Sequence, residues 1–159
     1  MTDMRRHRLL SVLAVLGAAA LAGCSLIKET QQVLNPTVAG EVIIRAAPGE
    51  PVTWTPAFCQ TGEIEQFFGF ILGGSGSPVV VRAVLDPLDG PGLRITGVEG
   101  TSPYGFVVRP ADCRVLDLRL QATDWRVNEL RDVNGSLDVS CTLKDGLSLE
   151  GSVEVSHCH

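Results

Sequence analysis

Short strand-like runs separated by turn residues recur from Gly40 to the C-terminus, and this pattern constrains the fold more than any other feature of the sequence. Within each run, residues are β-branched or alternate between apolar and polar, which is typical of strands. Clusters rich in Gly, Pro, Asn and Asp lie between the runs and indicate turns. The expected strands cover residues 41–45, 52–55, 63–72, 79–85, 93–98, 105–109, 113–122, 137–141 and 147–155.

The later strands alternate most clearly. Leu116, Leu118 and Leu120 would share one face with Ala122, while charged and amide side chains occupy the other face. Such a strand has one buried face and one face in water. Asn134-Gly135 predicts a two-residue hairpin turn between two such strands, and residues 123–133 before it fit no single pattern.

Together the runs amount to about eight to ten short strands with no long amphipathic helix among them. This organisation predicts an all-β domain built as an antiparallel β-sandwich, with a small β-barrel as the alternative. A helix is expected only at the N-terminus.

The N-terminus has the three parts of a secretory signal. Arg5, Arg6 and Arg8 form a basic head, and residues 9–23 form an uncharged apolar run that ends in small residues. That run has 15 residues, whereas a membrane-spanning helix needs about 20. We therefore expect residues 1–23 to be a signal peptide that forms a helix and is then removed.

The end of this segment, Leu21-Ala22-Gly23-Cys24, resembles the lipobox of bacterial lipoproteins. The resemblance implies that Leu21, Ala22 and Gly23 are recognition residues and that the thiol of Cys24 receives a diacylglycerol. Acylation of the new amine would then give two or three chains, which suffices for stable anchoring. Ser25 is not the Asp that retains many Gram-negative lipoproteins at the inner membrane. The outer membrane, on its periplasmic face, is therefore favoured; in a Gram-positive cell, the anchor would lie on the outer face of the plasma membrane.

Three segments follow from these patterns: a signal peptide (1–23), a lipidated cysteine with a polar tether broken by Asn35-Pro36 (24–40), and one β-domain (41–159). Without residues 1–23, the chain has 10 lysines and arginines against 17 aspartates and glutamates, a formal charge of −7. Because nucleic acids and anionic membrane surfaces attract basic patches, neither is an expected partner. Beyond the lipobox, the chain resembles small β-rich lipoproteins of high-GC bacteria only in general.

Four cysteines follow Cys24 and contain no C-x-x-C pair. In an exported domain, this even number predicts two disulfides rather than a zinc or redox site. Three pairings are open. We favour Cys113–Cys141, because Cys113 begins one strand-like run and Cys141 ends another, which leaves Cys59–Cys158.

The sequence contains no recognisable catalytic or metal-binding pattern. Residues 73–77 lack the final Gly of a nucleophile elbow, and Glu63 and Glu65 are expected on one wet strand face, where they could not flank a sugar. His157 and His159 lie at the C-terminus, where an oriented catalytic histidine is rare. If Cys158 forms a disulfide, His157-Cys158-His159 cannot bind zinc through its thiolate.

Three further features have ordinary structural explanations. The acidic, proline-rich stretch at 86–92 lacks the ligand spacing of a calcium loop and is expected to be a turn. The Asn134-Gly135-Ser136 sequon is interpreted as part of the same turn as Asn134-Gly135. Trp54 and Trp125 are expected in the core or at its edge.

The sequence thus predicts an enzymatically inactive envelope lipoprotein without cofactor or metal, which binds or scaffolds an envelope protein through an exposed strand edge or loop cluster. The alternative is a carrier of a small apolar ligand in a β-barrel. In that case Phe67, Phe68 and Phe70 would line the cavity.

Overall fold

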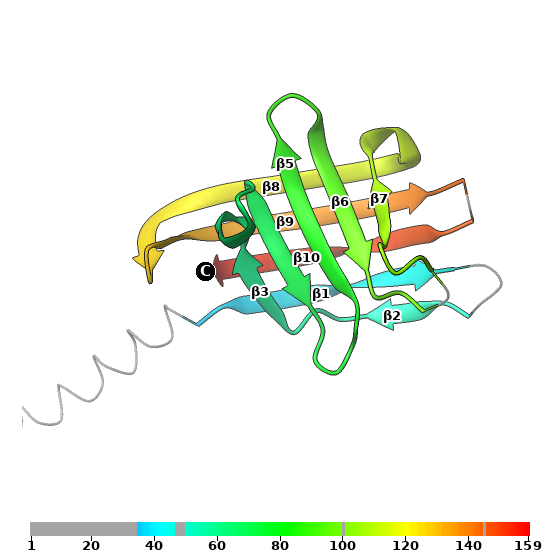
Figure 1. The fold of residues 1–159 in the computed structure, drawn as a ribbon, viewed down its shortest axis with the longest axis horizontal. Helices are drawn as coiled ribbons and strands as arrows, with labels where there is room; N and C mark the ends of the chain where they lie inside the picture. Colours follow the sequence, from blue (N-terminus) through cyan, green and yellow to red (C-terminus); the bar gives the residue numbers. More distant parts are fainter. Residues whose placement is uncertain (1–34, 47–49, 100, 145) are drawn as a thin grey trace, which may run out of the picture. The chain divides into compact units, whose positions relative to one another are not determined.

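Two five-stranded antiparallel sheets pack against each other in the computed structural model, and the strands of one cross those of the other (Figure 1). The structure describes residues 35–46, 50–99, 101–144 and 146–159. One compact unit spans Pro36–His159. The expected signal helix and the lipobox, including Leu21, Ala22, Gly23 and Cys24, lie outside the described residues. Within those residues, no helix has the length and hydropathy needed to cross a membrane.

The first sheet, sheet A, has the strand order β2-β1-β10-β9-β8. Its strands are β1 (Thr37–Arg45), β2 (Val52–Trp54), β8 (Cys113–Val127), β9 (Leu130–Thr142) and β10 (Ser148–Cys158). The second sheet, sheet B, has the order β3-β4-β5-β6-β7. Its strands are β3 (Phe58–Thr61), β4 (Gly69–Gly73), β5 (Val80–Asp86), β6 (Gly90–Thr96) and β7 (Phe106–Val108). Two 3₁₀ turns, η1 (Gly62–Glu65) and η2 (Pro110–Asp112), complete the described elements.

The sandwich is therefore confirmed, and the sheets do not close into the alternative barrel. Residues of β10 alternate between the core and the solvent: Leu149, Val153 and Val155 are buried, while Glu150 and Glu154 are exposed. The core lies between the sheets and takes side chains from both. Its most buried members include Phe70, Leu72, Ala83, Leu93, Ile95, Leu137, Leu149 and Val153. Burial of each large apolar side chain contributes about 1.5–3 kcal/mol.

Both favoured disulfides are present. Cys113 and Cys141 are cross-strand partners at the start of β8 and the end of β9. Cys59 on β3 is bonded to Cys158 on β10, so this bridge joins the two sheets across 99 residues of chain. The two bonds therefore stabilise different levels of the fold, one a hairpin and the other the sandwich.

The expected boundary at residue 41 is wrong by four residues, because β1 begins at Thr37. Thr37 to Gly40 pair with Ser156 to Val153 of β10. Their burial pattern is mostly exposed, so they carry little hydrophobic signal. The segment assigned to the tether therefore contributes the start of a strand.

The expected strand over 63–72 is also wrong in its first half. The Thr61 hydroxyl accepts a hydrogen bond from the backbone of Glu63 (3.4 Å) and caps η1, and Gln66 then takes a left-handed conformation (φ 63°). The strand begins only at Gly69, which packs so closely on β5 that a Cβ there would collide with the Ala83 carbonyl. A local cap thus overrides the alternating pattern.

Asn134-Gly135 is not a hairpin turn, and neither is the sequon that contains it. Both residues lie inside β9, and the β8–β9 turn is formed instead by Asn128 (φ 49°) and Glu129 (φ 72°). Two consecutive positive φ values are what a two-residue hairpin turn of type I′ needs. Position 135 needs a glycine for a different reason, because a Cβ there would lie only 2.6 Å from the Arg119 carbonyl of β8.

Candidate binding surface

β8 is an unusually long edge strand. In the part of the chain that the structure describes, the two sheets have four edge strands, and three of them, β2, β3 and β7, contain three or four residues each. β8 contains 15. Very short edges are a common protection against unwanted strand pairing, so β8 is the edge in this fold best able to pair with another chain.

The end of β8 projects beyond the rest of its sheet. The pairing of β10 with β9 ends at Cys158↔Val133, whereas β8 and β9 pair again beyond it, at Arg126↔Arg131 and Val127↔Leu130, after a register shift between Ala122 and Arg126. Figure 1 shows this turn reaching past the C-terminal end of β10. In this projecting hairpin, which we define as residues 123–132, β8 and β9 therefore pair only with each other.

Trp125 lies on the projecting hairpin and is 55% exposed. The expectation that it belongs to the core or its edge is therefore wrong, while Trp54, 3% exposed, is buried as expected. An exposed Trp on an edge strand is informative, because Trp is among the residues most enriched in the energetically dominant part of protein interfaces. Val115 (39% exposed) adds a second apolar side chain on the same strand.

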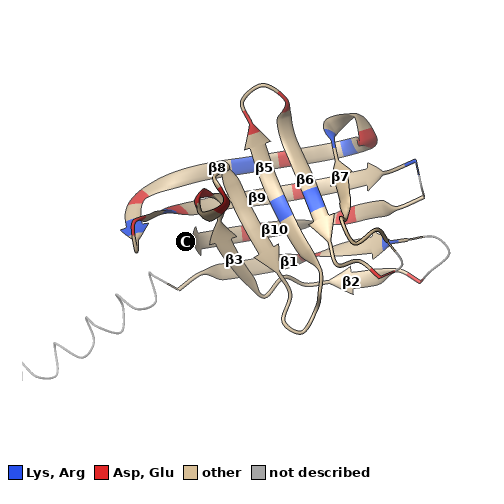
Figure 2. Cartoon of the chain, viewed as in Figure 1, with Lys and Arg blue, Asp and Glu red and all other residues tan. Residues whose placement is uncertain are grey.

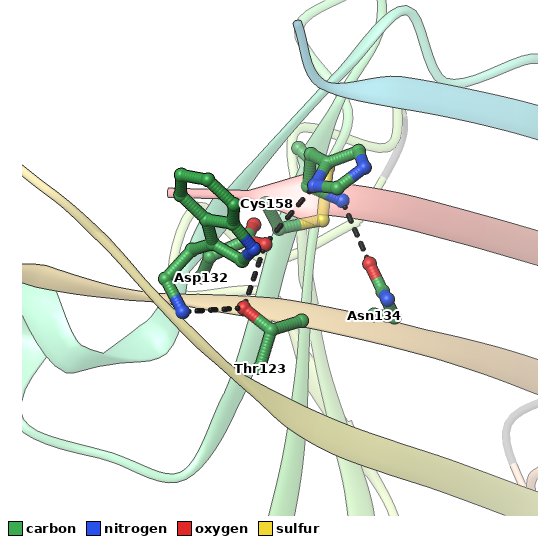
Figure 3. Close-up of polar contacts among 7 residues, drawn as sticks. Thr123, Asp132, Asn134 and Cys158 are labelled. Atoms are coloured by element: carbon green, nitrogen blue, oxygen red, sulfur yellow. Dashed lines mark hydrogen bonds and ion pairs between the residues drawn. A yellow bond between two sulfur atoms is a disulfide. The ribbon is translucent and has the colours of Figure 1, made fainter. Parts of the chain in front are cut away.

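A polar cluster ties the base of this hairpin to β10 (Figure 3). The Thr123 hydroxyl donates to Oδ2 of Asp132 (2.9 Å) and accepts from the backbone N–H of Trp125 (3.2 Å). The same Asp132 oxygen lies 3.0 Å from Nδ1 of His157. Asp132 is 1% exposed, so its carboxylate joins β8, β9 and β10 at a buried point.

His157 reaches the carboxylate because β10 bulges between Val155 and Cys158. At this bulge, His157 adopts φ 58° and its N–H donates to Oδ1 of Asn134 (2.9 Å). The neighbouring Cys158 is fixed by its disulfide to Cys59. A histidine expected in a terminal tail is thus held within the sheet.

The cluster has the geometry of a structural clamp. A Thr–His–Asp relay would need the hydroxyl bonded to the imidazole, whereas the Thr123 hydroxyl is bonded to the carboxylate. Among the described residues, no group of three His, Cys, Asp or Glu side chains is arranged to hold a metal. The clamp instead fixes the hairpin that carries Trp125.

The remaining candidate residues do not come together. Glu63 accepts from the backbone N–H of Arg131 (2.6 Å), whereas Glu65 pairs with Arg82, and both belong to η1 rather than to one strand face. Asp86 forms the expected turn, since its Oδ1 accepts from the backbone of Leu88 and Asp89, and these bonds lower the pKa of Asp86.

The three phenylalanines proposed to line one cavity have separate positions. Phe70 is fully buried in the core, Phe68 is 48% exposed, and Phe67 lines a shallow hollow on the outer face of sheet B. The predicted aromatic lining of a barrel is therefore wrong.

Comparison with known proteins finds no matching protein family, no matching curated protein and no matching solved structure.

Proposed function

We propose that this chain is an exported, lipid-anchored envelope protein whose β-sandwich binds an extended segment of a partner protein along β8. It acts by binding and not by catalysis. The observation that carries the proposal is the unpaired 15-residue edge of β8 in a fold whose other described edges contain three or four residues.

The binding mode is strand addition. A partner segment that pairs with β8 gains main-chain hydrogen bonds along the edge, and side-chain pockets then give specificity. Trp125 supplies a large apolar anchor at the projecting end. The clamp of Thr123, Asp132 and His157 holds that end in place before binding, which lowers the conformational cost of association.

The anchor rests on the N-terminal sequence. The basic head, the short apolar run and Leu21-Ala22-Gly23-Cys24 support lipid attachment at Cys24, and Ser25 favours the periplasmic face of the outer membrane. We expect Cys24→Ser to move the protein from the membrane fraction to the soluble fraction or to leave an uncleaved precursor. Mature protein that stays at the membrane without a lipid on residue 24 would contradict the anchor.

The binding edge is tested separately by photo-crosslinking in intact cells. A photoreactive amino acid placed at Gln121 or Trp125 of β8 should capture a partner protein, whereas the same group at Glu150, on the outer face of sheet A, should not. Equal capture from Glu150, or no capture from either β8 position, would contradict binding along this edge.

A further inference from the structure

The outer face of sheet B carries two arginines directly opposite each other. Arg82 of β5 and Arg94 of β6 are cross-strand partners, and Figure 2 shows one blue segment on each of these neighbouring strands. Like charges in this position repel each other and destabilise a sheet. The pair therefore needs a nearby anion.

The fold supplies an anion for one arginine of the pair. Glu65 of η1 accepts two hydrogen bonds from the guanidinium of Arg82, at 2.7 and 3.0 Å. Arg94 is exposed, and no described residue forms an ion pair or side-chain hydrogen bond with it. One positive charge on this face is therefore uncompensated.

A hollow of about 370 Å³ lies at this point, lined by Glu65, Phe67, Arg82, Val84, Arg94 and Thr96. Its size falls at the lower end of small-molecule sites. Phe67 and Val84 give it an apolar wall beside the two guanidinium groups. Another surface hollow lacks this imbalance, because Arg119 there is paired with Asp117 (2.6 Å) and Glu154 also lines the wall.

We propose that this hollow binds a small carboxylate that has an apolar body, with the carboxylate on Arg94 and the apolar body on Phe67 and Val84. The guanidinium of arginine matches a carboxylate through two parallel hydrogen bonds. Glu65 selects the charge of the ligand. It leaves room for one negative charge and repels a second, so a phosphate dianion is disfavoured.

Benzoate, phenyl phosphate and benzyl alcohol test the site, because they offer one negative charge, two negative charges and none on a similar ring. Binding to the full-length protein in nonionic detergent is followed through the methyl resonances of Val84. Benzoate should perturb them saturably and more strongly than the other two. Tighter binding of phenyl phosphate, or an equal response to benzyl alcohol, would overturn the proposal.

Variants of Arg94 test whether this side chain contacts the carboxylate of the ligand. Arg94→Gln should weaken benzoate binding at least about tenfold, whereas Arg45→Gln, which removes an exposed arginine of β1, should change it less than about twofold. Arg94→Lys keeps the charge without the planar fork and should give an intermediate loss. Benzoate binding to Arg94→Gln at the wild-type level, with the core methyl resonances unchanged, would overturn the proposal.

Glu65→Gln should have the opposite effect on benzoate affinity. This variant frees Arg82, so it should bind benzoate more tightly than the wild type and admit phenyl phosphate as well. Weaker benzoate binding would overturn the assigned role of Glu65. None of these measurements depends on β8 or on the lipid, so they test the hollow independently of the proposed protein partner.

Discussion

A single buried carboxylate joins three strands of sheet A. Asp132 accepts from Thr123 and contacts the His157 ring, and its second oxygen is buried without a hydrogen-bond partner among the described residues. A buried carboxylate is costly unless its hydrogen bonds are made. The contacts of Asp132 with Thr123 and His157 therefore contribute more to the stability of the fold than an average surface contact does.

Thr123→Val keeps the shape of the side chain and removes the hydroxyl. Asp132 loses a donor and the Trp125 N–H loses an acceptor, so we expect a loss of about 1–3 kcal/mol in the free energy of unfolding. Urea denaturation measures it. Thr142→Val, at the exposed end of β9, is the matched control and should change stability by less than about 0.5 kcal/mol. Equal effects would mean that the clamp contributes nothing.

Glu65 and Arg82 make a second residue-scale prediction, this time on pH. The guanidinium of Arg82, through its hydrogen bonds, lowers the pKa of Glu65. The ion pair therefore stabilises the fold at pH above the ordinary glutamate pKa, and this stabilisation disappears as pH falls through the lowered pKa. An NMR titration should give Glu65 a midpoint below the ordinary value, and Arg82→Gln should raise it toward that value. A midpoint unaffected by Arg82→Gln would contradict the pairing.

At the scale of elements, the β8–β9 hairpin separates what sequence patterns predict from what they miss. The strand over 113–122 was predictable because Leu118 and its neighbours alternate with polar residues. The position of the turn was not predictable, because Asn134-Gly135 has the stronger turn sequence although Asn128 and Glu129 form the turn. The β9 backbone around Gly135 is fixed by its close approach to β8, a tertiary constraint without a local signature.

Substitutions at Glu129 test the position of the β8–β9 turn. A non-glycine residue at φ 72° costs about 1 kcal/mol relative to glycine. Glu129→Gly should therefore stabilise the domain by about 0.5–1 kcal/mol, whereas Glu129→Ala should be nearly neutral. The midpoint of thermal unfolding reports both. If Glu129→Gly destabilised the domain, the turn would have to lie elsewhere.

The sequence predicts that the binding surface is an exposed strand edge, but it does not predict which strand forms that edge. Alternation and turn residues predict a sandwich with exposed edges, but which strand lies at an edge depends on the order β2-β1-β10-β9-β8. The sequence predicts a core position for Trp125 because tryptophan usually fills a core, and residues 123–133 show no clear period that would place it elsewhere. His157 was missed because its acceptor, Asp132, is 25 residues away in sequence and becomes its neighbour only in the sheet.

At the scale of the whole molecule, the two disulfides should differ in their contribution to stability. The chain-entropy relation gives about 4.7 kcal/mol for the loop closed by Cys59–Cys158 and about 3.6 kcal/mol for that closed by Cys113–Cys141. Replacing both cysteines of a bridge by serine should therefore destabilise the domain more for Cys59–Cys158, as measured by guanidinium denaturation. The reverse order would show that the hairpin bridge, not the bridge between sheets, limits the stability of the sandwich.

The proposed function depends most on the pairing of β8 with a partner chain. Hydrogen exchange of the protein, alone and with the partner that crosslinking at Gln121 identifies, tests this directly. We expect new amide protection in β8 and the projecting hairpin, with β2, β3 and β7 unchanged. Protection confined to another edge, or to the outer face of either sheet while the β8 amides exchange as fast as in the free protein, would contradict it.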